Sequence, residues 1–314
     1  MPKLRSDHLT RTVIIARTWA MINLEKIYTD VDDFCLLFLP QWEKHLIDSG
    51  LKQRIRPSKL SISEVMTIVI AFHQSGYRNF KTFYINHVLV YWRTEFPMLI
   101  SYTRMLKLMQ SVLVPLSSFL THQKAKPTGI AFIDSTKLQV CHNLRIPRHQ
   151  VFKGSAERGH GSMGWFYGFK LHLMINDEGQ ILAVKITQGN VDDRAPVPEM
   201  SDGLWGDLYG DKGYLSKNLQ ERLAEKGINL VTKKRKNMKA NMQRLWDRLM
   251  LRKRFIIETV FDQLKNISQI EHSRHRSCIS FMVNVLASLI AYSFKEKKPR
   301  IKISRHEKQF LMQI

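Results

Sequence analysis

Residues 129–136 read Gly-Ile-Ala-Phe-Ile-Asp-Ser-Thr. This run is apolar on both faces of an extended chain, so it predicts a buried central strand that carries the carboxylate of Asp134. Asp211 ends a second such run, within Asp-Leu-Tyr-Gly-Asp-Lys-Gly-Tyr at residues 207–214. A carboxylate at the end of a buried strand is costly unless its charge is compensated, and a divalent cation is the usual compensation. We therefore expect an acidic site where these two strands end.

A third carboxylate lies on a basic helix. Residues 254–265 read Arg-Phe-Ile-Ile-Glu-Thr-Val-Phe-Asp-Gln-Leu-Lys, and at about 100° per residue Arg254, Glu258 and Lys265 share one helix face. Taken alone, this face is most simply a solvated surface with an Arg–Glu pair. With Asp134 and Asp211, however, Glu258 completes a set of three carboxylates able to bind two Mg²⁺ ions, or Mn²⁺ in their place, for in-line attack on a phosphodiester.

The charge of the chain is strongly positive. The 49 Lys and Arg residues exceed the 27 Asp and Glu residues, which gives a formal charge of +22 over 314 residues. Such an excess is typical of proteins that bind nucleic acids. A basic run just before the Glu258 helix predicts contacts with the phosphates of the DNA backbone, although such runs are often only solvated loops. Its members are Lys233, Lys234, Arg235 and Lys236.

Other sequence features favour a cytoplasmic protein. Cys35, Cys141 and Cys278 are odd in number and far apart in the sequence, which predicts reduced thiols rather than disulfides or a metal site. We find no targeting segment, and the longest apolar stretch, residues 281–294, is too short to span a bilayer. No membrane partner is expected.

Three regions follow one another along the chain. Residues 1–125 show helical periodicity and predict an all-α DNA-binding domain, which is either a helix-turn-helix or an ordinary helical bundle. Residues 126–270 alternate strands and helices, and predict an α/β domain with a mixed five-stranded sheet and flanking helices. The expected strands cover residues 130–140, 165–175, 181–187, a segment ending near 211, and 229–232, and one long helix covers 242–267. Residues 271–314 form a C-terminal helix and basic tail.

Smaller features receive plainer interpretations. Ser61 and Glu64 have the spacing of a capping box at a helix start. Either Asp192 or Asp193 is interpreted as the cap of a short helix that begins at about Ala195. Trp246 is assigned to the core in preference to a base-stacking role, and His172 is given no role.

The motifs together carry a resemblance to a known family. The strand acid followed by Ser-Thr, the Tyr-Gly-Asp-Lys-Gly-Tyr motif at 209–214 and the Arg-x-x-x-Glu-x-x-x-x-x-x-Lys spacing resemble the DDE transposases of bacterial insertion sequences. One branch carries a Tyr-Arg-Glu-Lys signature on its last catalytic helix. Arg254, Glu258 and Lys265 match its intervals, whereas Leu251 stands at the Tyr position. The chain length, the helical N-terminal third and this Leu are similar to the insertion-sequence 982 group.

The resemblance implies a fold, a reaction and a set of partners. The fold is ribonuclease-H-like, and Asp134, Asp211 and Glu258 are the metal-binding catalytic residues, with Arg254 and Lys265 on DNA phosphates. The enzyme would cleave double-stranded DNA at the inverted repeats of its element and join the 3′-hydroxyl to target DNA. It would act as a homo-oligomer in a synaptic complex, associated with the bacterial nucleoid. The alternatives are a metal-dependent nuclease and a catalytically decayed DNA-binding protein.

Overall fold

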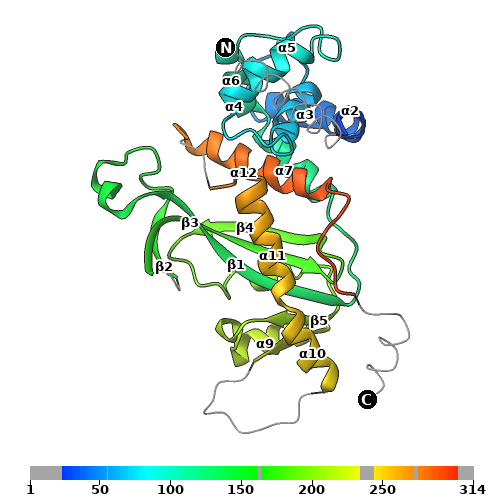
Figure 1. Ribbon diagram of the computed structural model, residues 1–314, viewed down its shortest axis with the longest axis vertical. Helices are drawn as coiled ribbons and strands as arrows, with labels where there is room; N and C mark the ends of the chain where they lie inside the picture. The colour runs from blue at the N-terminus through cyan, green and yellow to red at the C-terminus, as the bar shows by residue number, and fades with distance from the viewer. Residues whose placement is uncertain (1–22, 55, 162–163, 234–243, 272–274, 303–314) are drawn as a thin grey trace, which may run out of the picture. The chain divides into compact units, whose positions relative to one another are not determined.

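The computed structural model of the chain describes residues 23–54, 56–161, 164–233, 244–271 and 275–302 (Figure 1). The chain divides into two compact units. Unit 1 comprises Met1–Gln123 and Leu264–Phe294, and unit 2 comprises Lys124–Gln263 and Lys295–Ile314. The domain bounds predicted from the sequence at 125 and 270 stay a prediction.

Unit 1 is helical throughout its described regular elements. The central helix α3 is almost entirely buried, and α12 packs against α3, α6 and α7. The expected capping box at the start of α3 is confirmed, because Glu64 N donates to Ser61 Oγ at 3.0 Å and Ser61 N donates to the Glu64 carboxylate at 2.6 Å. The elements are α2 (Leu24–Asp48), α3 (Ile62–Phe72), α4 (Phe80–Phe83), the π-helical η1 (Tyr84–Val88), α5 (Leu89–Tyr91), α6 (Tyr102–Ser111), α7 (Leu113–His122) and α12 (Cys278–Ser293).

Unit 2 is built on one mixed sheet. Its strands are β1 (Ile130–Cys141), β2 (Glu157–Gly161), β3 (Gly164–Asn176), β4 (Ile181–Gln188), β5 (Gly206–Gly210) and β6 (Ile228–Thr232). The spatial order is β2-β3-β1-β5-β6, with β4 also paired to β3. β3 runs antiparallel to β1, β2 and β4, while β5 runs parallel to β1 and β6.

The predicted mixed sheet and its antiparallel meander are confirmed, but the strand count is corrected from five to six. The strand that the sequence missed is β2, which reads Glu-Arg-Gly-His-Gly. It has neither apolar alternation nor β-branched residues, so it lacks a strand signal and forms only because β3 offers it a pairing edge.

Helices cover both faces of the sheet. On the face of Ile133, α8 (Val197–Met200) and α9 (Lys217–Ala224) enclose a core with β1, β5 and β6. On the other face, Phe132 stacks on Tyr209, and the Tyr209 hydroxyl donates to Asp247 of α10 (Leu245–Lys253) at 3.1 Å. α11 (Phe255–Asp262) follows and packs against β1 (Figure 1).

The single long helix predicted over 242–267 is therefore corrected. α10 and α11 are separate, with Arg254 between them. Ile257 N bonds to Arg254 O three residues back at 3.1 Å, which tightens the chain at the junction. The last turn, η4 (Gln263–Ile267), is π-helical. Within the parts of the chain that the structure describes, no helix is long and apolar enough to cross a membrane.

Candidate active site

Asp134 and Asp211 lie level with each other on neighbouring strands. β1 and β5 are parallel, and the last residues in register are Phe132 and Tyr209. Asp134 stands two residues beyond Phe132, and Asp211 stands two residues beyond Tyr209. The pairing of β1 with β5 therefore places the two acids side by side, although they lie 77 positions apart in the sequence (211 − 134). Asp211 follows the end of β5 as expected, whereas Asp134 lies within β1, which continues to Cys141.

Local hydrogen bonds orient both carboxylates. Ser135 N donates to Asp134 Oδ1 at 2.8 Å, and Lys212 N donates to Asp211 Oδ1 at 2.7 Å. Asp211 follows β5 directly and is the N-cap of the short 3-10 helix η3 (Lys212–Tyr214). Each acid keeps a second carboxylate oxygen that neither of these backbone bonds uses.

Arg254 joins the third carboxylate to the first. Its guanidinium donates to Asp134 Oδ2 at 2.9 Å and to Glu258 Oε1 at 3.0 Å. The position of Arg254 at the α10–α11 junction lets one side chain reach both the sheet and the next helical turn. The predicted Arg–Glu pair is thus present, and it is not merely a solvated pair, because the Arg254 side chain is only 15% exposed.

The pKa of Asp134 shows that a positive charge close to its carboxylate stabilises the charged form. Burial raises the pKa of Asp134, the Arg254 guanidinium acts in the opposite direction, and the charge of Asp211 raises this pKa further. Asp211 is thus near enough for its charge to disfavour ionisation of Asp134. Arg254 is the group that offsets this repulsion in the structure, as a metal ion would.

The three acids suit a divalent metal chemically, because carboxylate oxygens are the ligands that Mg²⁺ and Mn²⁺ prefer. In the described segments, however, no group of three or more His, Cys, Asp or Glu side chains surrounds a single point as metal ligands would. Glu258 is 59% exposed and turned to Arg254.

A buried polar cluster lies on the opposite face of the sheet from Asp134. Its buried members are His172 and Tyr214, and its partly exposed members are Ser135, Lys170, Thr187 and Asp193. Side chains alternate between faces along a strand, so Ser135 points away from its neighbour Asp134 and shares a face with its register partner His172. The His172 side chain is fully buried, and its Nε2 lies 2.8 Å from Thr187 Oγ1.

Asp193 and Tyr214 complete this buried polar cluster. Lys170 pairs with Asp193 at 3.0 Å, and His172 Nδ1 lies 4.0 Å from the same carboxylate oxygen. Burial raises the pKa of the Tyr214 phenol well above its usual value, and the charges of Asp134 and Asp193 add to this effect. Tyr214 therefore lies within electrostatic reach of acids from both faces of the sheet.

Sequence reasoning missed these residues. The interpretation of Asp193 as a helix cap is wrong, because α8 has no side-chain cap and Asp193 pairs with Lys170. Asp192 instead accepts bonds from Arg194 in a turn. The sequence did offer one signal for this cluster, because His172 stands at an inward position of an apolar strand. Its partners could not be predicted, since they come from other strands and loops. Trp246 is buried, as predicted.

The predicted DNA-contacting cations have separate positions. Arg254 is described above. Lys265 belongs to unit 1, where it pairs with Glu271 at 3.3 Å. Lys233 is exposed just after β6, while Lys234, Arg235 and Lys236 lie outside the described residues. Their contacts with DNA stay predictions.

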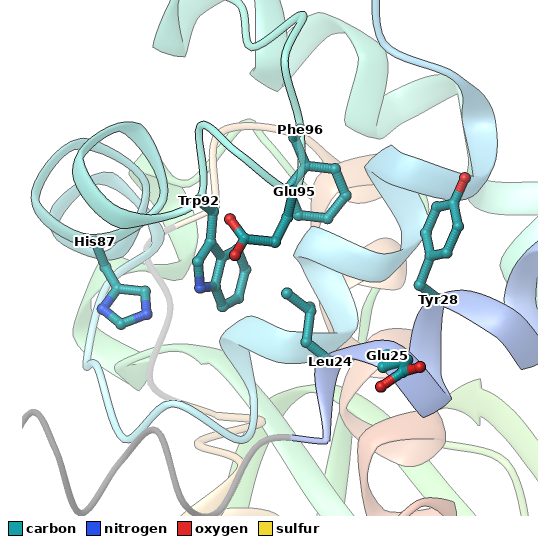
Figure 2. Close-up of a pocket in the computed structure, with 7 residues that line it drawn as sticks. All are labelled: Leu24, Glu25, Tyr28, His87, Trp92, Glu95 and Phe96. Carbon is teal, nitrogen blue, oxygen red and sulfur yellow. The ribbon is translucent and has the colours of Figure 1, made fainter.

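A separate pocket of about 370 Å³ lies within unit 1 (Figure 2). It is lined by aromatic and aliphatic side chains with two carboxylates at its margin, and none of the three candidate catalytic acids belongs to it. The lining residues are Leu24, Glu25, Tyr28, His87, Trp92, Glu95 and Phe96.

Comparisons with known proteins bear on the sheet unit. Residues 124–278 match the family model of a transposase DDE domain, and domains of this kind generally use divalent metal ions. A comparison with curated proteins finds no match. Among solved structures, the chain is similar to a cryo-EM structure of the piggyBac transposase synaptic complex with hairpin DNA, at 13% identity and a TM-score of 0.42. That alignment covers 92% of this chain and 76% of the other, but so low a score supports no argument here. The family match includes Asp134, Asp211 and Glu258.

Proposed function

We propose that this chain is a DDE transposase that cleaves DNA at the ends of its element and joins the 3′-hydroxyl to target DNA. The observation that carries the proposal is the level placement of Asp134 and Asp211 on adjacent parallel strands, with Arg254 linking Asp134 to Glu258. The match of residues 124–278 to a transposase DDE domain supports it independently.

The finer features of the proposal rest on the sequence resemblance and on strand order. The order β4-β3-β1-β5-β6, antiparallel and then parallel, fits the ribonuclease-H-like fold expected from that resemblance. The Arg254, Glu258 and Lys265 intervals favour the Tyr-Arg-Glu-Lys branch, with Leu251 marking the insertion-sequence 982 group. Double-stranded DNA and a second copy of the chain are the partners that such a reaction requires.

Asp134, Asp211 and Glu258 would hold two Mg²⁺ ions, whose chemistry is to activate the attacking water or 3′-hydroxyl and stabilise the leaving oxygen. The protein's own part is positioning. The Ser135 and Lys212 amides fix one oxygen of each aspartate. Arg254 favours the charged form of the partly buried Asp134 and can transfer its charge-assisted bonds to a DNA phosphate. No side chain is required as a nucleophile.

The test uses the DNA that flanks the gene as substrate, with Mg²⁺ or Mn²⁺. Asp134→Asn, Asp211→Asn and Glu258→Gln should each lower strand cleavage by about a hundredfold or more. Glu221→Gln is the matched control, because Glu221 is an exposed acid on α9. Each variant should keep its affinity for DNA, since DNA binding depends on the cations and not on these acids.

Metal binding gives a readout besides activity. Mn²⁺ should raise the melting temperature of the unmodified chain and of Glu221→Gln, and should raise that of Asp134→Asn much less. Full cleavage by Asp134→Asn would remove that residue from the mechanism. Cleavage without joining would favour the nuclease alternative, and DNA binding with no cleavage in either metal would favour a decayed element.

A further inference from the structure

An exposed tryptophan stands on a basic arm of unit 2. The arm, here residues 142–161 with 164–165, comprises the 3-10 helix η2 (Asn143–Arg148), the segment 149–156, β2 and the start of β3. The Trp165 side chain is 64% exposed. Such exposure of a large apolar ring is unfavourable, because most of its surface stays in water. Figure 1 shows the arm extending from the β2–β3 end of the sheet.

The arm presents Trp165 on a supported frame. Asn143 Nδ2 donates to Trp165 O at 2.8 Å, which ties η2 to β3. Phe152 anchors the intervening segment, because its side chain is buried and its carbonyl accepts from the Tyr167 hydroxyl at 3.2 Å. His160 touches the Trp165 ring edge-on, with centroids 5.2 Å apart. One edge of the indole is thereby held while much of its surface stays open.

The charge of the arm suits a polyanion. Arg145, Arg148, Lys153 and Arg158 are all exposed, and Glu157 is the single acid among residues 142–161. Among the described residues, none of these four cations takes part in a salt bridge. Exposed cations without carboxylate partners keep their charge available to a phosphate chain.

We propose that the arm binds an unpaired stretch of DNA, with a base stacked on Trp165 and phosphates on the arm's exposed cations. Bases within a duplex are stacked on one another, so an open indole face can take only a base that is unpaired or at an end. The inference rests on the proposed function, because strand cleavage there supplies DNA ends with accessible bases. It adds a binding site for the cleaved strand, separate from the carboxylates in sequence and in strand position.

Trp205 provides a matched control. It also belongs to unit 2 and is 58% exposed, but it lies against Gly129 in a segment flanked by Asp202 and Asp207. Both Trp165→Ala and Trp205→Ala remove an exposed indole, so general effects on solubility or stability should be similar. Trp165→Phe keeps an aromatic face and should retain most of the binding.

The experiment measures affinity for oligothymidine and for a blunt duplex, in EDTA so that no cleavage occurs. Trp165→Ala should weaken oligothymidine binding by roughly tenfold and duplex binding by less than about twofold, while Trp205→Ala changes neither. Arg145→Ala with Arg148→Ala should lower the salt dependence of oligothymidine binding by up to about 1.4 in log–log slope. The same change at Lys217 and Arg222 on α9 should leave it unaltered.

Unchanged oligothymidine affinity in Trp165→Ala, or an equal loss in Trp205→Ala, would overturn the proposal. Circular dichroism of each variant establishes that the fold is kept. If Trp165→Ala unfolds, Trp165→Leu, which keeps an apolar side chain but has no aromatic face, replaces it in the comparison. Binding in EDTA is independent of catalysis. If Trp165→Ala loses affinity but the chain never cleaves DNA, the proposed binding site on the arm stands and the transposase proposal fails. If the chain cleaves DNA but Trp165→Ala binds normally, the transposase proposal stands and the binding site on the arm fails.

Discussion

At the scale of single residues, the candidate site depends on charges held close together. Burial disfavours the charged form of Asp134, and Arg254 favours it. The neighbouring Ser135 belongs to the separate buried polar cluster on the other face of the sheet. Both faces therefore contain groups whose ionisation is linked to folding. His172 is the member of the buried cluster whose response to pH can be stated most directly.

Burial lowers the pKa of His172 from 6.5 to about 4, against the opposing charge of Asp193 and with a smaller contribution from Lys170. The folded chain thus keeps His172 neutral in a range where the unfolded chain protonates it. Stability is unaffected above pH 6.5 and falls as the pH drops toward 4, by on the order of 3 kcal/mol for this residue. We expect His172→Gln to show a shallower loss than the unmodified chain when chemical denaturation is followed across this window.

The control for that measurement is His142→Gln, because His142 is exposed. Its pH profile should match that of the unmodified chain. His73 and His275 also have pKa values lowered to about 4 by burial, so part of the acid sensitivity should persist in His172→Gln. A profile for His172→Gln as steep as the original would mean that His172 is not kept neutral by the fold.

At the scale of elements, β3 organises the sheet. Its residues 164–168 pair with β2 and its residues 169–175 pair with β4, both along the edge that faces away from β1. Two strands can follow one another along one edge only if their ends approach closely. Gly159 of β2 and Gly189 after β4 meet at this point, where a side chain has no room.

Gly159→Ala should therefore destabilise unit 2. A Cβ at residue 159 would lie 2.1 Å from Gly189 O and 2.8 Å from the Phe166 ring, so backbone must shift, at a cost of about 1–3 kcal/mol. Gly161→Ala lies in the same strand with nothing within 4 Å of its Cβ, and should change stability little. The midpoint of urea unfolding measures both. Equal stability of the two variants would contradict the close approach of β2 and β4.

At the scale of the whole molecule, a charge of +22 would make the proposed DNA binding an electrostatic process. The three candidate acids lie in unit 2, where Arg254 pairs with two of them, Asp134 and Glu258. Counterion release then sets the overall affinity, while particular cations decide where the DNA lies.

Charge reversal in the predicted basic run tests this at the level of the chain. Lys234→Glu with Arg235→Glu should weaken duplex binding and reduce the slope of log affinity against log salt by up to about 1.8, if each cation contacts one phosphate. The control is Lys217→Glu with Arg222→Glu, which changes net charge equally on α9, the helix on the face of the sheet away from α11. If the two double variants give the same slope of log affinity against log salt, the basic run is only a solvated loop that does not contact DNA.

The sequence by itself determined which segments become strands and helices where apolar periodicity is strong. The capping box of α3, the run ending at Asp134 and the alternation of 165–175 are local signals, because backbone geometry and side-chain burial act over a few residues. The three candidate acids were also identifiable, since each stands in a motif of its own. Strand β2 and the break at Arg254 were not, because no local pattern marks them.

Tertiary structure alone decided which residues meet. The level placement of Asp134 and Asp211 follows from the parallel pairing of β1 with β5, and the reach of Arg254 follows from the packing of α10 and α11 over that sheet. His172, Asp193 and Tyr214 come together from a strand, a loop and a 3-10 helix, and the first and last lie 42 positions apart (214 − 172). Spacing in sequence carries no record of such contacts, because they arise only when the sheet forms and its two faces are covered.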